Sequence, residues 1–498
     1  MIRCFLVLSL FITGVNAQKS SDPLLVIGDE LRQRIWVDSI YSSMTLEEKV
    51  GQLFVVQAFS NKNKNHKDDI INDIRNNNIG GVIFSKGSPH KQVDFTNTFQ
   101  SESSVPLLIG MDAEWGLNMR LDSTFAFPWN MTLGAIKDNK LIRHVGRSIA
   151  EHCKRIGVNF NFAPVVDINT NPKNPIIGNR SFGESTENVA LKSLNYMYGQ
   201  QEMNILSSAK HFPGHGDTST DSHKTLPFIN HEKQRIFNTE LKPFKTLINN
   251  GLESVMIAHL EVPSLESVNG LPSTLSYSIV TSLLKNTLGF KGLIITDALE
   301  MKGLSTFKSN GNLDMLAFKA GNDVLLMSAN VSEGIKSIIN EYDKGRISEE
   351  RLSYSVKKIL KAKYKVGLNN FLPISKNNLY NDLNSLQNNL LREELVEKSI
   401  TVVKNKDNIL PIINLKSTIG YLNFGNDDYM TFFDALTKYS KIDHLNDLDI
   451  LKSESASFIQ SNYKTVIIGI HANSDTPWKS YNLKKEEINF INRISKKV

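Results

Sequence analysis

The densest cluster of chemically active side chains lies in residues 210–223, Lys-His-Phe-Pro-Gly-His-Gly-Asp-Thr-Ser-Thr-Asp-Ser-His. Three His, two Asp and one Lys fall within these fourteen residues. Two Gly and one Pro predict a loop, from which side chains can converge on one site. An Asp two residues before a His can hold the imidazole in one tautomer and keep its pKa near neutrality. Asp221 and His223 therefore form a candidate acid–base pair.

Acid–base chemistry at a glycosidic or ester bond also needs a nucleophile. The sequence has no Gly-x-Ser-x-Gly motif, which excludes a serine nucleophile of that type. Asp297 directly follows the apolar run 292–296, Gly-Leu-Ile-Ile-Thr, and is well placed to act as a carboxylate nucleophile. A helix-capping role for Asp297 is the alternative interpretation.

A metal site is the alternative interpretation of the loop, with His211, His215 and His223 as ligands of a metallohydrolase. Metal ligands usually come at the tight spacing of a helix or a hairpin, and this loop offers no such frame. We therefore favour acid–base chemistry, and we expect no metal and no other cofactor.

Eight short β-branched apolar runs are separated by amphipathic segments of helical length. They span residues 50–56, 81–84, 107–111, 160–166, 206–209, 254–258, 293–296 and 324–327. Continuous hydrophobicity is typical of parallel strands buried on both faces. Eight such units predict an α/β fold of the TIM-like (β/α)8 barrel type, with an open doubly wound sheet as the alternative.

Polar residues follow most of the predicted strands. They are Asp112 and Glu114 after the third, Asp167 after the fourth, Lys210 and His211 after the fifth, His259 and Glu261 after the sixth, and Asp297 after the seventh. Catalytic side chains of a barrel gather at the carboxyl ends of its strands. This distribution favours the barrel over the open sheet.

Two helices are predicted from their boundaries. Thr45-Leu46-Glu47-Glu48 is a capping box that begins one helix. Asp138 begins another, which Gly157 ends, and Cys153 falls on its apolar stripe. We therefore expect Cys153 to fill the core rather than to react.

Composition restricts the class of protein. The 498 residues are 40% hydrophobic and 22% charged with two Cys, which excludes low-complexity disorder and a disulfide scaffold. The net charge of +6 is spread along the chain, so we expect no nucleic-acid partner. About 500 residues predict two domains, or one barrel with an appendage.

Residues 1–17 have the pattern of an export signal: one positive charge, an apolar run and the small-x-small site Val15-Asn16-Ala17. A buried N-terminal helix is the alternative. No later segment reaches 18 consecutive apolar residues, so we expect no stable membrane span. These features predict an exported protein, periplasmic or secreted.

Four segments resemble the family 3 glycoside hydrolases, and more narrowly their bacterial β-N-acetylhexosaminidase branch. They are the loop 210–223, Gly-Asn-Arg-Ser-Phe-Gly at 178–183, Met-Thr-Leu-Glu-Glu-Lys-Val-Gly-Gln at 44–52, and Ile-Thr-Asp-Ala-Leu at 295–299. The family's β-glucosidase branch usually has Trp after the nucleophilic Asp, where this sequence has Ala298.

The resemblance implies a retaining exo-β-N-acetylglucosaminidase that forms a covalent glycosyl-enzyme and acts on cell-wall or chitin-like oligosaccharides, including muropeptides. It makes Asp297 the nucleophile, His223 the acid and base, and Asp221 the partner of His223. The implied substrate-binding residues are Asp112, Arg120, Arg180, Lys210 and His211. The family often has Gln in place of Ala113 and Gly in place of Trp115, so the shape of the 112–116 loop stays open.

Three other functions remain as alternatives. A neutral imidazole repels an incoming anion less than a carboxylate does, so phosphate could replace water and make the protein a phosphorylase. A β-glucosidase of the same family and a noncatalytic glycan-binding barrel are the others. The exact glycan, the aglycone and the oligomeric state are not predicted.

The expected domains are the signal peptide (1–17), the catalytic barrel (25–365), a linker (366–395) and a partial flavodoxin-like α/β sandwich (396–498). Strand-like runs in the last part lie at 401–403, 419–422 and 466–470. A flavodoxin-like sheet usually has five strands. We therefore expect a short or incomplete second domain.

Overall fold

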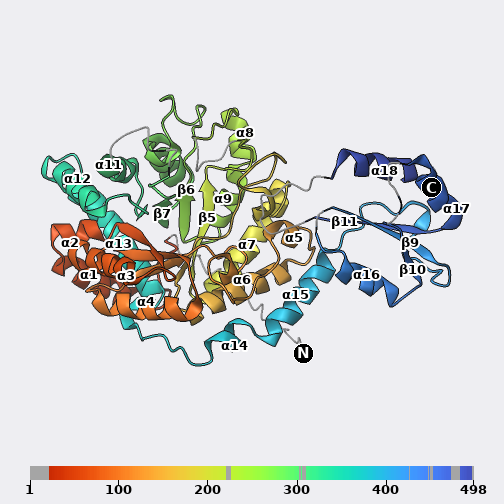
Figure 1. The fold of residues 1–498 in the computed structure, drawn as a ribbon. Helices are drawn as coiled ribbons and strands as arrows, with labels where there is room; N and C mark the ends of the chain where they lie inside the picture. The colour runs from red at the N-terminus through yellow and green to blue at the C-terminus, as the bar shows by residue number, and fades with distance from the viewer. Residues whose placement is uncertain are drawn as a thin grey trace, which may run out of the picture.

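The computed structural model describes residues 22–219, 226–301, 304, 310–425, 427–446, 448, 452–472 and 483–495. These residues form a large unit of strands and surrounding helices, followed by a smaller α/β unit at the C-terminal end (Figure 1). The predicted signal segment, 1–17, lies outside the described residues. No described helix is long and apolar enough to cross a membrane.

The large unit contains one parallel sheet of eight strands in the order β7-β6-β5-β4-β3-β2-β1-β8. The strands are β1 (Phe54–Phe59), β2 (Gly81–Lys86), β3 (Leu108–Met111), β4 (Phe160–Asn161), β5 (Leu206–Phe212), β6 (Ser254–Ile257), β7 (Leu293–Thr296) and β8 (Leu325–Leu326). A parallel bridge between Ile295 and Val324 joins β7 to β8 and completes the ring. The predicted (β/α)8 barrel is confirmed.

Helices pack around the ring (Figure 1). They are α1 (Glu30–Ser43), α2 (Leu46–Gly51), α3 (Lys64–Asn77), α4 (Pro89–Glu102), α5 (Asn130–Gly134), α6 (Asn139–Arg155), α7 (Thr186–Glu202), α8 (Lys233–Asn238), α9 (Leu241–Ile248), the π-helix η4 (Ser278–Thr287), α11 (Asn310–Ala320), α12 (Val331–Asp343) and α13 (Glu349–Lys365). Asp138 caps α6 by accepting from the Lys140 N–H, and Cys153 is fully buried, so both predictions for this helix are confirmed.

Two of the predicted strands have different limits in the structure. Residues 50 and 51 of the first run belong to helix α2, because Thr45 and Glu48 form the capping box that begins it, and β1 starts only at Phe54. The fourth run, 160–166, is a strand only at Phe160 and Asn161. Pro164 has no N–H to donate, so the regular pairing is interrupted there, and it resumes only as an isolated bridge between Val165 and Lys210.

The smaller unit follows α14 (Leu379–Leu383) and α15 (Leu386–Ser399), and α15 crosses the predicted boundary between linker and second domain. Its sheet is parallel with the order β10-β9-β11. The strands are β9 (Ile419–Gly425), β10 (Ile442–His444) and β11 (Val466–His471), and the helices are α16 (Met430–Thr437), α17 (Ser453–Asn462) and α18 (Lys485–Ser495). Numbered along the chain within this unit, the strand order is 2-1-3, which is also the order of the first three strands in a flavodoxin-like 2-1-3-4-5 sheet.

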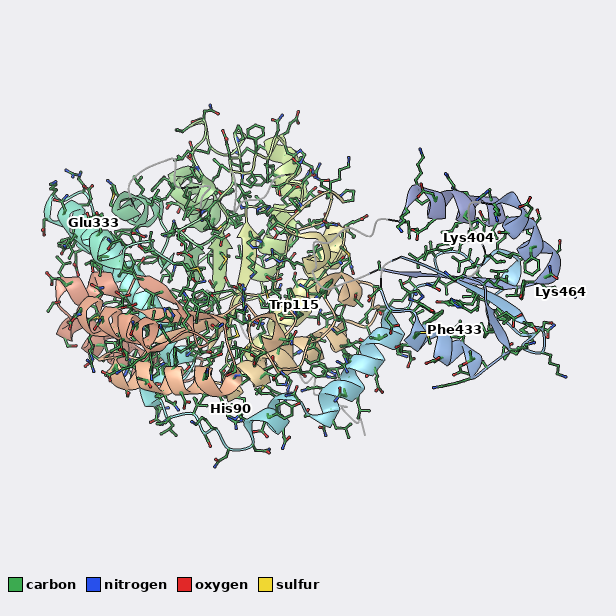
Figure 2. All side chains as sticks on the ribbon, in the orientation of Figure 1. His90, Trp115, Glu333, Lys404, Phe433 and Lys464 are labelled. Atoms are coloured by element: carbon green, nitrogen blue, oxygen red, sulfur yellow. The ribbon has the colours of Figure 1, made fainter. Side chains whose placement is uncertain are left out.

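One predicted strand of the smaller unit is wrong, and one was missed. Residues 401–403 are not in a strand, and their side chains are exposed, that of Val403 at 94%. The missed strand is β10, whose sequence Ile-Asp-His is too short and polar to give a strand signal. Phe433, labelled in Figure 2, lies in α16 beside the sheet, with its ring centroid 5.5 Å from that of Tyr421.

A buried ion cluster joins the amino end of β8 to α13. The fully buried Asp323 carboxylate accepts hydrogen bonds from the Ile294 N–H (3.0 Å), Ser355 Oγ (2.5 Å) and Lys358 Nζ (2.5 Å). Burial alone would raise the pKa of Asp323, but the positive charges of Lys358 and Lys285 outweigh it and leave that pKa well below its usual range. Asp323 is therefore ionised and compensates Lys358 inside the protein.

We expect the substitution Asp323→Ala to lower the free energy of unfolding by about 3–5 kcal/mol, because it leaves the buried Lys358 ammonium without its carboxylate. Urea unfolding followed by circular dichroism measures this loss. Asp343→Ala removes an exposed carboxylate from α12 and should change stability by less than about 0.5 kcal/mol. Equal losses in the two variants would contradict the role given to Asp323.

Candidate active site

The predicted site residues of the described chain meet at the carboxyl ends of the barrel strands. Asp112 follows β3, Lys210 and His211 lie at the end of β5, and Asp297 follows β7. Arg120 directly follows the 3-10 turn Leu117–Met119, and Arg180 is the last residue of the 3-10 turn Gly178–Arg180. Asp221 and His223 lie outside the described residues, so their roles stay predictions.

Five charged side chains form a row of alternating sign, Arg120–Asp112–Lys210–Glu114–Arg180, which we name the charged row. Arg120 contacts Asp112 at 2.5 Å, and Lys210 Nζ lies 2.7 Å from Asp112 Oδ1 and 2.8 Å from Glu114 Oε1. Arg180 donates two hydrogen bonds to the Glu114 carboxylate, from Nε at 3.0 Å and from NH2 at 2.8 Å. Each buried charge therefore has an opposite charge beside it.

The charged row keeps its acids ionised. Burial alone would raise the pKa of Asp112, but Lys210 and Arg120 outweigh it and hold that pKa well below its usual range. Burial likewise opposes ionisation of Glu114, and Arg180 and Lys210 overcome it, so that the pKa of Glu114 is about 2. Both carboxylates are acceptors only at neutral pH.

Glu114 was not among the predicted site residues, although it follows the third predicted strand. Its side chain is fully buried, so it does not reach a ligand itself. It orients Arg180 and Lys210 instead, and those two cations were predicted to bind substrate. Its position two residues after Asp112 was the only signal in the sequence, and its partners are 66 and 96 residues away along the chain.

The 112–116 loop has a defined shape, which the sequence left open. Asn161 on β4 donates to the Ala113 carbonyl and accepts from the Ala113 N–H at 2.9 Å. The buried Tyr196 hydroxyl lies 3.1 Å from the backbone carbonyl oxygen of Ala113 and 3.0 Å from that of Glu114. Trp115, labelled in Figure 2, packs edge-on against Trp129 with ring centroids 6.1 Å apart.

Asp167 connects the end of β4 to the loop after β5. Its carboxylate accepts from His211 Nδ1 (2.7 Å), the His211 N–H (3.2 Å) and the His215 N–H (2.7 Å). The Nδ1 proton of His211 is therefore committed to Asp167, and Nε2 faces the guanidinium of Arg180 at 3.4 Å. The sequence placed Asp167 after the fourth predicted strand but gave no sign of this triple contact.

His215 is a neutral histidine. Burial lowers its pKa to about 4, and its Nδ1 lies 2.7 Å from Thr218 Oγ1. Among the described residues, no three His, Cys, Asp or Glu side chains are grouped so that they could hold a metal ion. His223, the third ligand of the metallohydrolase alternative, lies outside that part of the chain.

Asp297 has the properties that a carboxylate nucleophile needs. Its backbone N–H continues the β6–β7 pairing by donating to the Ile257 carbonyl, and its Oδ1 accepts from the Ala298 N–H at 2.8 Å. Burial would raise the pKa of Asp297, but His259, His211, the Ala298 N–H and Lys210 together hold it below its usual value. Asp297 is therefore an ionised carboxylate within electrostatic reach of the charged row.

The closed barrel and the ionised carboxylates at the carboxyl ends of its strands are those of a TIM-barrel enzyme site. Residues 45–362 match the family described as "Glycosyl hydrolase family 3 N terminal domain". The chain belongs to glycosyl hydrolase family 3.

Relatives share both sequence and fold. The chain is 31% identical over 394 residues to Beta-hexosaminidase A of Pseudoalteromonas piscicida, which covers 73% of this chain but only 65% of the relative's length. The solved structure of a family 3 beta-N-acetylglucosaminidase from Paenibacillus sp. str. FPU-7 is 30% identical, with a TM-score of 0.69 over 86% of this chain and 84% of that one. A Beta-glucoside phosphorylase, 23% identical, shares the fold with a TM-score of 0.77 over 93% and 86%.

We expect the stability difference between the wild type and Glu114→Gln to depend on pH. A pKa depressed in the folded state contributes stability that is present above the unfolded-state pKa and lost as pH falls through the folded-state pKa. For Glu114 this window runs from the ordinary value of 4.5 down to about 2. Urea unfolding at constant ionic strength should show a wild-type advantage of roughly 3 kcal/mol near neutral pH that shrinks steadily below pH 4.5.

Glu333→Gln, which changes an exposed carboxylate on α12, is the matched control and should differ from the wild type by a small amount that varies little with pH. A Glu114→Gln difference that stays constant across the acid range would show that Glu114 is not the depressed, ion-paired carboxylate described above.

Proposed function

We propose that the protein is a retaining exo-β-N-acetylglucosaminidase that removes terminal β-linked N-acetylhexosamine from cell-wall or chitin-like oligosaccharides. The observation that carries this proposal is the carboxylate of Asp297 at the end of β7, whose pKa the nearby charges of His259, His211 and Lys210 hold below its usual value. Membership of family 3 and the hexosaminidase names of the relatives support it.

In the first step, the Asp297 carboxylate attacks the anomeric carbon and forms a covalent glycosyl ester. The bond to the leaving group breaks, and the leaving oxygen takes a proton from His223, whose imidazole Asp221 orients in this proposal. In the second step His223 removes a proton from water, which attacks the same carbon and releases Asp297. The configuration is retained because the carbon is inverted twice.

The charged row would bind the sugar in the nonreducing subsite. Asp112 and Arg120 are partly exposed, so their remaining acceptor and donor positions are available to sugar hydroxyls. Arg180 and His211 would bind from the other end of the row, where Glu114 and Asp167 fix their orientation. Because every partner is already in place, little reorganisation is needed when the sugar binds.

Export to the periplasm or the medium is a separate proposal that rests on residues 1–17. It favours a wall or environmental glycan as the substrate. N-terminal sequencing of the mature protein tests it, and Gln18 as the first residue is the expected result.

Trapping with a 5-fluoro N-acetylglucosaminyl donor, followed by peptide mapping, tests the mechanism. We expect the label on Asp297, and we expect Asp297→Asn to lower kcat on an aryl N-acetylglucosaminide by about a thousandfold or more, because the nucleophile is lost. Asp343→Asn removes a carboxylate from the surface and should leave kcat unchanged. Release of aryl glucoside without aryl N-acetylglucosaminide would instead support the β-glucosidase alternative.

Phosphorolysis is the second candidate, favoured by a histidine rather than a carboxylate as the predicted acid and base. The products distinguish the two reactions when the same substrate is turned over in phosphate and in a sulfonate buffer of equal ionic strength. We expect free N-acetylhexosamine in both. Sugar 1-phosphate together with faster turnover in phosphate would make the protein a phosphorylase, and binding without turnover in either buffer would leave the glycan-binding barrel.

A further inference from the structure

His259 is a buried histidine beside the candidate nucleophile that the proposed mechanism does not use. It follows β6, the strand next to β7, and only 1% of its surface is exposed. Its two ring nitrogens contact different elements, Nδ1 the Thr274 hydroxyl at 2.6 Å and Nε2 the Ala298 carbonyl oxygen at 2.9 Å. These contacts determine its protonation state.

The Thr274 contact requires a proton on Nδ1. Thr274 Oγ1 also lies 2.7 Å from the Ala258 carbonyl oxygen, which can only accept. The single hydroxyl proton of Thr274 must therefore point to Ala258, because two oxygens at this distance with no proton between them would repel. The Thr274 oxygen then has only lone pairs to offer His259, and Nδ1 is the donor.

The Ala298 contact requires a proton on Nε2, because a carbonyl oxygen is also an acceptor only. A histidine that donates from both ring nitrogens is an imidazolium cation. Of the groups in the described part of the chain that favour the ionised form of Asp297, His259 has the largest effect. The cation and the carboxylate therefore compensate each other's burial.

His259 also fixes the backbone that orients the nucleophile. The carbonyl of Ala298 accepts from His259, and the N–H of the same residue donates to Asp297 Oδ1 at 2.8 Å. Both the carbonyl and the N–H of Ala298 are therefore engaged. Displacement of the His259 imidazole would move the Ala298 N–H, which orients one carboxylate oxygen of Asp297.

We propose that His259 is a positioning residue for the glycosidase reaction: a permanently protonated imidazolium that holds the Ala298 backbone and supplies the positive charge that keeps Asp297 ionised and aimed. This inference rests on the proposed function, in which Asp297 is the nucleophile. Among the described residues, the other charged or titratable groups that act on Asp297 come from β5 and the turn after it, and they are Lys210, His211 and His215.

Two variants remove the charge in different ways. His259→Gln keeps an N–H donor near the Ala298 carbonyl but is neutral. Thr274→Val keeps nearly the same shape and removes the acceptor for Nδ1, so the imidazolium loses the partner that stabilises its proton. Ser273→Ala is the matched control, because Ser273 donates to the same Ala258 carbonyl at 2.7 Å from the neighbouring position.

We expect kcat to fall by roughly 10- to 100-fold in both variants, while KM changes by less than about twofold, because ground-state sugar contacts are untouched. The acid limb of the kcat/KM profile should move up by about one pH unit, since Asp297 loses a neighbouring opposite charge. Ser273→Ala should keep the wild-type profile. A loss of thermal stability in the two variants with kcat and the acid limb unchanged would overturn the proposal.

Histidine-selective ¹⁵N NMR of the full chain tests the protonation state without substrate. We expect one imidazolium signal, with both nitrogens protonated, that persists from about pH 5 to 8 and disappears in His259→Gln. A neutral tautomer for His259 in that range would overturn the inference even if Asp297 is labelled by the fluoro sugar. If the imidazolium is present but no glycoside is cleaved, the proposed function fails instead.

Discussion

The site depends on the contact between Lys210 and two carboxylates, Asp112 and Glu114. Lys210 is only 2% exposed and Glu114 is fully buried, so each would destabilise the fold alone. Together with Arg120 and Arg180 they connect the ends of β3 and β5 with the 178–180 turn. If one member were missing, its partner would be left as an uncompensated buried charge. The same condition preorganises the donors and acceptors that a sugar would meet.

The barrel supplies the geometry that this set of charges requires. Parallel strands bring residues as far apart as 112 and 297 to one end of the ring, and other buried side chains then fix the backbone between them. Asn161 and Tyr196 hold the loop that carries Asp112 and Glu114, while Asp167 holds both His211 and the turn to His215. Several side chains predicted to touch substrate are therefore oriented by side chains that were not predicted to touch it.

Periodic hydrophobicity was enough to predict the barrel and the end of it that carries the site, because each buried strand is local in sequence. It failed in three places. The capping box at Thr45 places the start of the first predicted run in a helix, and Pro164 interrupts the fourth strand. Residues 401–403 are apolar but exposed, and they form no strand. The site residues at strand ends were predictable in the same way. The roles of Glu114, Asp167 and His259 were not, because each depends on contacts with residues distant in sequence, which carry no local pattern.

The charges of the described site also bear on which group transfers the proton. Asp112, Glu114, Asp167 and Asp297 all have pKa values below their usual range, so none holds a proton at neutral pH. His215, with a pKa of about 4, is unprotonated too. His211 donates its Nδ1 proton to the Asp167 carboxylate in a hydrogen bond and turns Nε2 toward Arg180. The ring nitrogens of His259 face Thr274 and the Ala298 carbonyl. A general acid must hold a transferable proton at the working pH. These groups are fixed charges and orienting partners, which supports assigning the proton transfer to His223 with Asp221.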